Sequence, residues 1–169
     1  MDAYTQRHYP RLRGDPKASR NKYEWDEESG TISLDRRLYA AVTYPTDYGF
    51  IPETIAGDGD ELDAMVTVTE PTFPGCSIPA KPIALLKMHD GEKRNDKVLT
   101  VPVSDPSWSG LDDLSGMPGF LAREIEHFFE VYSEIEGTGW EQEGWGSKED
   151  AKELIESCRE RYRANESGS

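Results

Sequence analysis

The middle of the chain consists of short apolar stretches separated by turn-forming residues. Hydrophobic and polar residues alternate over residues 62–69, and apolar runs follow at residues 78–88 and 97–103. Alternation is typical of a half-buried strand, and short apolar runs between turns are typical of a buried one. The pattern therefore predicts three strands in this part of the chain.

Upstream of these strands the pattern is more broken. Residues 22–25 and 31–36 flank a Ser-Gly turn, which predicts a β-hairpin. Residues 44–52 are interrupted by prolines, so we predict an irregular edge or loop segment there. Residues 1–20 show no clear period and are predicted to form an irregular lead-in.

The last third of the chain has a helical period. Apolar residues recur every three or four positions between Pro118 and Gly137, which predicts an amphipathic helix. A second helix is predicted to start at Ser147, because Ser147 and Asp150 have the spacing of a capping box. The tail, residues 164–169, is expected to fray. Short strands followed by two helices predict an α+β domain with helices packed on a small sheet.

The length and the net charge of the chain limit its number of domains and its classes of partner. The chain has 169 residues, enough for a single domain over residues 1–169 with its own core. Its formal net charge of −14 disfavours nucleic acid and anionic membranes as partners, and we interpret it as adaptation to high salt. No apolar run is long enough to cross a bilayer, and no signal-peptide core begins the sequence. Since Cys76 and Cys158 lack metal-like spacing, we expect a cytoplasmic protein with reduced thiols.

One stretch has a marked chemical character. Asp58-Gly59-Asp60-Glu61-Leu62-Asp63 places four acids within six residues. Gly59 permits a tight turn, so neighbouring carboxylates can share a centre, and carboxylate oxygen is the natural ligand of a hard divalent cation. The alternative is a solvated acidic turn. An EF-hand loop is excluded, because its required glycine would fall on Asp63.

Further polar residues lie at predicted strand ends and in loops. They are Lys22 with Glu24, Arg36, Tyr44 with Tyr48, and an acidic loop, residues 90–96, that ends before Lys97. Taken singly, such charges are more often solvated, and such tyrosines more often pack with the hydroxyl in water. Together they supply cationic and phenolic donors beside metal-binding carboxylates, a combination that suits a metal-bridged phosphate.

Several runs match one known family in order. They are RNKYEWD, LDR ending at Arg36, YPTDYGFIP, DGDELD, PGCSIPAKPIALLKM, DKVLTVPV, EIEHFFEVY and EGWG. Through these runs the chain resembles the soluble family I inorganic pyrophosphatases. The resemblance implies a five-stranded, OB-like β-barrel flanked by two main helices. It also implies hydrolysis of pyrophosphate to two phosphates with Mg²⁺, or with Mn²⁺ or another divalent cation, and a homo-oligomer, a hexamer in prokaryotic members.

The resemblance also implies roles for matching residues. Asp60 would activate the attacking water. The metal ligands would be Asp58, Asp63 and Asp90, with Glu24 behind them in the same cavity. The residues that bind the phosphates would be Lys22, Arg36, Tyr44, Tyr48, Lys97 and Tyr132.

Three positions depart from the family pattern. The metal-bridging aspartate two residues before the lysine is Asn95 here, with Asp96 one step later. Asparagine offers only a neutral carbonyl oxygen, so it binds a metal more weakly and cannot act as a base. Asp96 can take the catalytic and metal-binding role only if the loop shifts, because neighbouring side chains in extended backbone point to opposite faces. A family glutamate aligns with Gly14, next to Asp15, and a family lysine aligns with Ser133.

Two classes of function follow. The first is a Mg²⁺-dependent pyrophosphatase, with reduced or altered activity, or a phosphatase acting on a related phosphoanhydride or small phosphoester. The second, favoured by the three departures, is a protein of the same fold that binds metal or phosphate, or assembles with an active paralogue, without turnover. Nucleic-acid binding through an OB-like surface is disfavoured by the charge and by the lack of an aromatic and basic stripe.

Overall fold

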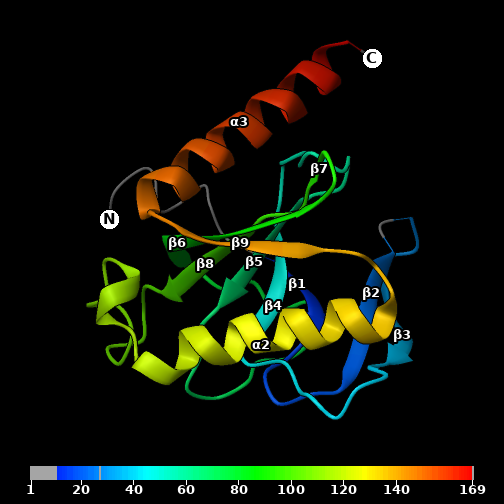
Figure 1. The fold of residues 1–169 in the computed structure, drawn as a ribbon. Helices are drawn as coiled ribbons and strands as arrows, with labels where there is room; N and C mark the ends of the chain where they lie inside the picture. The colour runs from blue at the N-terminus through cyan, green and yellow to red at the C-terminus, as the bar shows by residue number, and fades with distance from the viewer. Residues whose placement is uncertain (1–10, 27, 169) are drawn as a thin grey trace.

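A mixed β-sheet forms the centre of the molecule, and one long helix covers each of its faces (Figure 1). The computed structural model describes residues 11–26 and 28–168. The strands are β1 (Arg11–Asp15), β2 (Asn21–Asp26), β3 (Thr31–Arg37), β4 (Asp47–Ile51), β5 (Leu62–Val66), β6 (Ala80–Asp90), β7 (Lys93–Arg94), β8 (Lys97–Pro102) and β9 (Glu141–Gly146). The helices are the short 3-10 turn η1 (Leu114–Gly116), α2 (Gly119–Glu136) and α3 (Lys148–Ser167).

The path β1-β4-β5-β8-β6 provides the five strands of the expected OB-like sheet, and the short β7 and β9 both pair with β6. The pairings are antiparallel except between β5 and β8, which run parallel with Ala64 opposite Val98. Strands β2 and β3 form a separate hairpin, in which Lys22 pairs with Arg36. The predicted α+β class with two main helices is confirmed.

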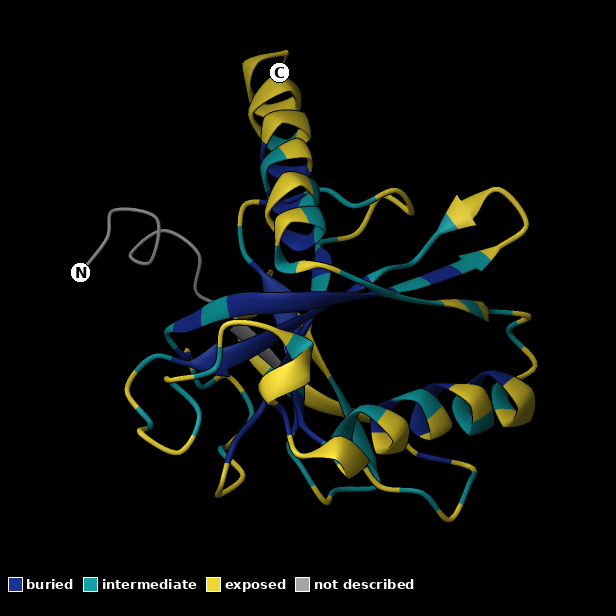
Figure 2. Ribbon diagram, turned by 60° about the vertical axis from the view of Figure 1, so that its left-hand side comes forward, coloured by how far each residue is buried: buried dark blue, intermediate teal, exposed yellow. Residues whose placement is uncertain are grey.

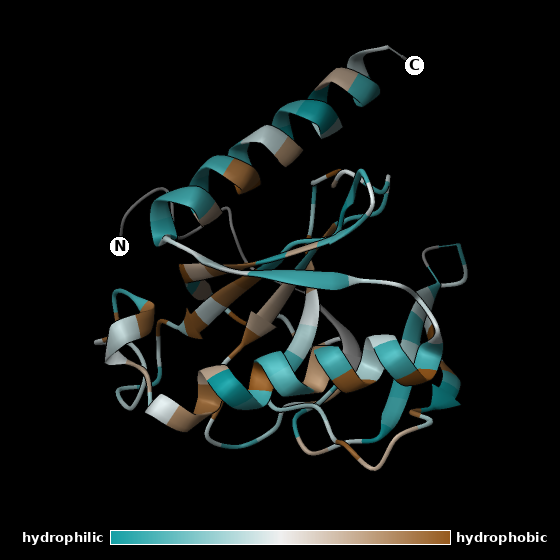
Figure 3. Ribbon diagram, in the orientation of Figure 1, coloured by the Kyte–Doolittle hydropathy of each residue, from teal (hydrophilic) through white to brown (hydrophobic). Residues whose placement is uncertain are grey.

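Among the described residues, each face of the sheet carries a hydrophobic core, and a third, smaller cluster consists of Val66, Val68, Ile78 and Ala80. Successive residues in a strand point to opposite faces, so Leu86 packs toward Phe128 and Phe129 of α2, while Leu85 packs with Ile155 of α3. The central strands are accordingly the most buried part of the chain, and the outer faces of both helices are exposed (Figure 2). Hydrophobic residues are concentrated in the central strands, and hydrophilic residues predominate on the outer faces of both helices (Figure 3).

Most predicted elements are present. The hairpin, the three central strands and both helices form where the patterns place them, and the Ser147–Asp150 capping box is complete. Helix α2 ends at Gly137, whose φ of 67° is in the left-handed region that favours glycine. Across the described residues, no helix combines the length and the apolar character that a membrane span requires.

Three expectations are wrong in part. Residues 47–51 form strand β4 with a partner on each side, because Pro45 and Pro52 lie just outside it and remove no ladder hydrogen bond. The irregular lead-in contains strand β1, while residues 1–10 lie outside the described residues. The tail does not fray at residue 164, because α3 continues to Ser167.

Candidate active site

A cavity of about 180 Å³ lies between the central sheet and the inner face of α2. Its polar lining brings together side chains far apart in the sequence, and its apolar lining comes from Met88, Phe128, Phe129 and Trp140. The polar residues are Asp15, Lys22, Tyr44, Tyr48, Asp63, Asn95, Lys97, Tyr132, Ser133 and Thr138. Seven of these were named as site residues from the sequence.

Lys97 is at the centre of the hydrogen-bond network. Its ammonium lies 2.6 Å from Oδ2 of Asp63 and 2.6 Å from Oδ1 of Asn95. Strands β5 and β8 are parallel neighbours, which puts Asp63 and Lys97 side by side on the same face. The Tyr48 hydroxyl donates to the same Asp63 oxygen at 2.8 Å. Lys97 is only 3% exposed, so this pairing keeps a charge inside the protein with its partners beside it.

A second group of charges joins the hairpin to α2. The Arg36 guanidinium donates to Glu136 at 2.7 Å and to the Tyr132 hydroxyl at 3.3 Å, and it also pairs with Asp35. Burial lowers the pKa of Arg36, but the hydrogen bond to Glu136 and the nearby negative charges outweigh it and raise the pKa. Lys22 pairs with Asp35 at 3.1 Å.

Asp15, the acid next to the position of the family glutamate, also lines the cavity. Asp15 is 1% exposed and accepts a hydrogen bond from the Tyr23 amide at 2.8 Å. Between Leu12 and Asp15 the pairing of β1 with β4 shifts register, and such a bulge redirects the side chain that follows it. Burial first, and then Asp15, raise the pKa of Tyr44.

The acidic residues at the start of the loop 58–63 lie outside the cavity. Asp58 and Asp60 are exposed, and Asp58 accepts a hydrogen bond from the Asp60 amide at 3.1 Å. Gly59 between them has a φ of +92°, the left-handed conformation for which a glycine was expected. The structure thus brings Asp63 to the cavity and leaves Asp58 and Asp60 on the turn that leads into β5.

Asp90 and Glu24 are not among the residues that line the cavity. Asp90 is exposed at the end of β6, and its carboxylate lies beside Gly139, where an added Cβ would be 3.5 Å from Oδ1. Glu24 is an exposed residue of β2 that lies 3.7 Å from the ammonium of Lys22.

The neighbours Asn95 and Asp96 face different ways. Asn95 lines the cavity and contacts Lys97, whereas Asp96 accepts hydrogen bonds from the Met88 amide at 2.9 Å and from Arg94 at 2.8 Å. Arg94 also pairs with Glu143 of β9 at 2.9 Å. The loop shift that would turn Asp96 toward the cavity is therefore not observed.

Comparison with known proteins identifies the family and the fold of this chain. A family model described as inorganic pyrophosphatase matches residues 15–163, a span that includes every lining residue named above. The chain belongs to the inorganic pyrophosphatase family. This confirms the family I assignment made from the sequence runs, and with it the enzyme class, inorganic diphosphatase.

Individual relatives agree in length and fold. The inorganic pyrophosphatase of Methanosarcina acetivorans is 47% identical over 87% of this chain and 88% of its own. That of Haloferax volcanii is 45% identical over 88% of this chain and 85% of its own. The solved inorganic pyrophosphatase of Thermus thermophilus superposes with a TM-score of 0.85 at 38% identity, covering 92% of this chain and 90% of that one.

Family I pyrophosphatases use a divalent cation, and carboxylate and amide oxygens are suitable ligands for one. Asp63 and Asn95 offer oxygen ligands in the cavity. Asp58 and Asp60 lie on the turn before β5, and Asp90 is the last residue of β6. The ammonium of Lys97 donates hydrogen bonds to Asp63 and Asn95, so one oxygen of each residue is already engaged by a positive charge. Within residues 11–26 and 28–168, however, no three His, Cys, Asp or Glu side chains are grouped closely enough to hold a metal ion.

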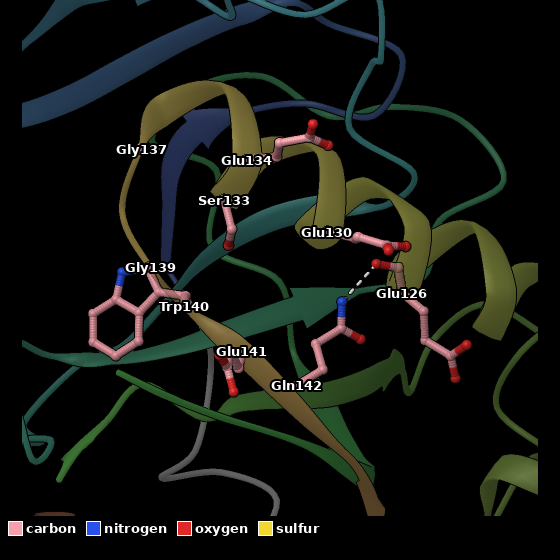
Figure 4. Close-up of a pocket in the computed structure, with 9 residues that line it drawn as sticks. All are labelled: Glu126, Glu130, Ser133, Glu134, Gly137, Gly139, Trp140, Glu141 and Gln142. Atoms are coloured by element: carbon pink, nitrogen blue, oxygen red, sulfur yellow. Dashed lines mark hydrogen bonds between the residues drawn. The ribbon is translucent and has the colours of Figure 1, made fainter. Parts of the chain in front are cut away.

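A larger and more open groove of about 810 Å³ lies beside this cavity, between α2 and β9 (Figure 4). Four glutamates line it, Glu126, Glu130, Glu134 and Glu141, and Gln142 donates a hydrogen bond to the Glu126 carbonyl at 2.7 Å. Ser133 and Trp140 line both spaces. The periodicity of α2 predicts its buried face, but nothing in the sequence pairs its outer glutamates with β9.

Proposed function

We propose that this protein hydrolyses inorganic pyrophosphate to two phosphates in a reaction that depends on Mg²⁺ or Mn²⁺. The observation that carries the proposal is the arrangement of Lys97, Asp63 and Tyr48 in a cavity also lined by Lys22 and Tyr132. Cations and phenols that point into one small space suit a doubly charged phosphate group. Family membership supports the same chemistry.

Each proposed ligand has a defined task. Lys22, Lys97 and Arg36 donate to phosphate oxygens and stabilise the charge that moves to the leaving phosphate. The hydroxyls of Tyr48, Tyr132 and Tyr44 are neutral donors. For Tyr132, burial raises the pKa despite the opposing effect of Lys22 and Arg36, so the phenol keeps its proton at neutral pH.

Acidic residues perform the remaining tasks. Asp58, Asp63 and Asp90 would hold the cation, with the Asn95 carbonyl oxygen as a weaker ligand and Glu24 behind them. When bound, the cation supplies Lewis-acid polarisation and partial neutralisation of the phosphate charge. Asp60 accepts the proton of the attacking water. Asp96, held by Arg94 and the Met88 amide, fixes the backbone that presents Asn95.

Release of phosphate from pyrophosphate with Mg²⁺ at high KCl tests the proposal. Asp60→Asn should lower kcat by about a hundredfold or more, because removing a general base typically costs about 10²–10⁴-fold. Glu61→Gln, in the same loop, is the control and should retain kcat. Absence of turnover in the wild-type protein at high enzyme concentration would contradict the proposal.

A second candidate is binding without turnover. Asn95 favours it, because a neutral amide faces the cavity where the family pattern has a carboxylate. Isothermal titration that shows pyrophosphate binding, together with no release of phosphate, would support this candidate.

We also propose that the protein forms a homo-oligomer, with the hexamer as the expected size. Within the part of the chain that the structure describes, six large apolar side chains are substantially exposed, namely Trp25, Leu34, Tyr39, Phe73, Phe120 and Ile135. Light scattering coupled to gel filtration would measure the mass, and a monomer at micromolar concentration would contradict this proposal. The expected cytoplasmic location stays a prediction.

A further inference from the structure

A row of carboxylates lies along one side of α2, facing β9. Glu126, Glu130 and Glu134 are four residues apart, so they share one side of the helix, with neighbouring Cβ atoms about 5–6 Å apart. Glu141 of β9 lines the same groove (Figure 4). Among the described residues, Glu130, Glu134 and Glu141 form no ion pair. Like charges at this spacing repel one another, so a cation in the groove relieves an unfavourable interaction.

The backbone of α2 adds to the negative potential of this groove. Gly137, which ends the helix, lines the groove, and the last turn of α2 contains no basic residue. The C-terminal end of a helix dipole is negative and favours a cation nearby. Side chains and backbone therefore attract positive charge to the same place.

A buried hydroxyl gives an independent indication of a ligand. Ser133 lines the groove and is 8% exposed, and its hydroxyl has no hydrogen-bond partner within the described part of the chain. Such a group is costly, so nearly all buried hydroxyls in folded proteins have a partner. In Figure 4 the hydroxyl points from α2 toward β9. Because Glu130 and Glu134 lie beside it on the helix, the partner that enters from this groove is a cationic donor.

The spacing of the carboxylates decides the kind of cation. Across the described ranges, three His, Cys, Asp or Glu side chains are nowhere grouped closely enough to hold a metal ion. Glu126 and Glu134 are separated by about 12 Å along α2, because the helix rises about 1.5 Å per residue. In a linear polyamine, spacers of three or four carbons separate the amines by about 5–6 Å, which matches the spacing of successive glutamates.

The size and the lining of the groove suit the same ligand. Its volume of about 810 Å³ is in the range of small-molecule sites. Trp140 lies at one end of the groove (Figure 4). Its indole offers an apolar surface to the methylene groups of a polyamine and a π-face to an ammonium group.

We propose that the groove between α2 and β9 binds a linear polyamine, whose ammonium groups pair with Glu130, Glu134 and Glu141 and donate a hydrogen bond to the Ser133 hydroxyl. Glu126 contributes less, because one of its carboxylate oxygens already accepts a hydrogen bond from the Trp145 indole at 2.7 Å. The groove takes a cation, whereas the catalytic cavity takes an anion, so this site does not depend on the proposed function.

Isothermal titration with spermidine and putrescine in about 0.1 M KCl tests the site. One spermidine should bind per chain, about threefold or more tightly than putrescine, because it forms one more ion pair. The double variant Glu130→Gln/Glu134→Gln should raise the Kd for spermidine about tenfold, since each exposed pair contributes a factor of about three. Ser133→Ala should raise it about threefold through loss of one hydrogen bond.

Glu153→Gln/Glu160→Gln is the matched control, because it changes the net charge equally. Both residues are exposed on α3, and neither lines the groove. The Kd for spermidine should stay within about twofold of the wild type, since charges farther away than a Debye length are largely screened. Equal Kd values in the two double variants would show that spermidine responds only to the overall charge, and would overturn the site.

Nuclear magnetic resonance locates the bound ligand. Spermidine should shift the indole N–H resonance of Trp140, which Trp140→Phe identifies by its loss. An unshifted resonance at saturating spermidine would also overturn the site. The titrations contain no pyrophosphate, so a wild-type protein that binds spermidine in this way but does not hydrolyse pyrophosphate retains the site and contradicts only the proposed function.

Discussion

At the scale of single residues, the neighbours Asn95 and Asp96 differ in what they contact. One neutral side chain faces Lys97, and the adjacent carboxylate is held outside by Arg94. Extended backbone alternates its side chains, so the two cannot exchange places without a change of register. The metal affinity and the rate should therefore depend on the identity of residue 95.

Asn95→Asp should restore a carboxylate at the cavity wall. A second negative charge near Asp63 favours a divalent cation, so we expect the apparent affinity for Mg²⁺ to rise about tenfold or more, with a faster release of phosphate. The measurement is the rate of pyrophosphate hydrolysis as a function of Mg²⁺ concentration.

Asp96→Asn is the matched control for this change. Its amide oxygen still accepts from the Met88 amide, so the Mg²⁺ dependence should stay within about twofold of the wild type. Equal Mg²⁺ affinity in Asn95→Asp and the wild type would show that residue 95 does not contribute to the cation site.

Because of the buried Tyr44 phenol, we expect the free energy of unfolding to depend on pH in the alkaline range. Burial first, then Asp15, raise its pKa above the ordinary value of 10.0. The unfolded chain thus loses this proton at a lower pH than the folded protein, so the stabilisation is complete below about pH 10 and is lost as the pH rises above it. Between about pH 10 and pH 11, the free energy of unfolding should fall by about 1 kcal/mol more in the wild type than in Tyr44→Phe. Urea unfolding at both pH values measures this difference.

Tyr39→Phe serves as the control, because Tyr39 is 62% exposed. This variant should show the same alkaline decline as the wild type. If Tyr44→Phe declines as steeply as the wild type, the buried phenol does not account for the effect.

At the scale of elements, turns and caps place the functional side chains. The bulge in β1 turns Asp15 into the cavity, and the parallel register of β5 and β8 puts Asp63 beside Lys97. The loop before β5 depends on Gly59, whose φ of +92° is costly for a residue with a Cβ atom. We therefore expect the backbone geometry of this loop to affect activity as well as stability.

Gly59→Ala should lower both stability and activity. A left-handed alanine costs about 1–2 kcal/mol, and relief of that strain would move Asp58 and Asp60. Gly30→Ala is the control, since Gly30 has a φ of +64° in the hairpin turn and open space around it. Thermal unfolding should show a similar loss for both variants, while pyrophosphate hydrolysis should fall only in Gly59→Ala. A matching loss of activity in Gly30→Ala would contradict a local role for the loop.

At the scale of the whole molecule, charge and packing oppose each other. The sheet buries apolar side chains on both faces, whereas the surface carries most of a net charge of −14. Self-repulsion of that charge destabilises the compact state and is screened by salt. The protein should therefore depend on ionic strength more than a neutral domain of the same size.

Stability should rise with salt. The Debye length falls from about 10 Å at 0.1 M to about 3 Å at 1 M, so the midpoint of thermal unfolding should increase over this range of KCl concentration. The same series in NaCl should give a similar rise, because screening depends on ionic strength. Equal or greater stability in dilute buffer would exclude adaptation to high salt.

The sequence by itself determined those helices and strands whose apolar or capping pattern repeats within a few residues. The spacing of apolar residues in α2, the capping box of α3 and the alternation in β5 each depend on residues a few positions apart. The runs around Lys22, Tyr48 and Asp63 likewise identified the family. By contrast, β9 is polar and contains glycines, so only its pairing with β6 makes it a strand.

The tertiary structure alone decided which side chains meet. Asp63 contacts Lys97, Arg36 contacts Tyr132, and Thr138 shares a cavity with Lys22, although each pair is far apart in the sequence. It also decided that Asn95 and Asp15 face the cavity while Asp96 does not. The physical reason is that apolar periodicity sets which face of an element is buried, whereas strand register, bulges and packing set which polar groups on different elements come into contact.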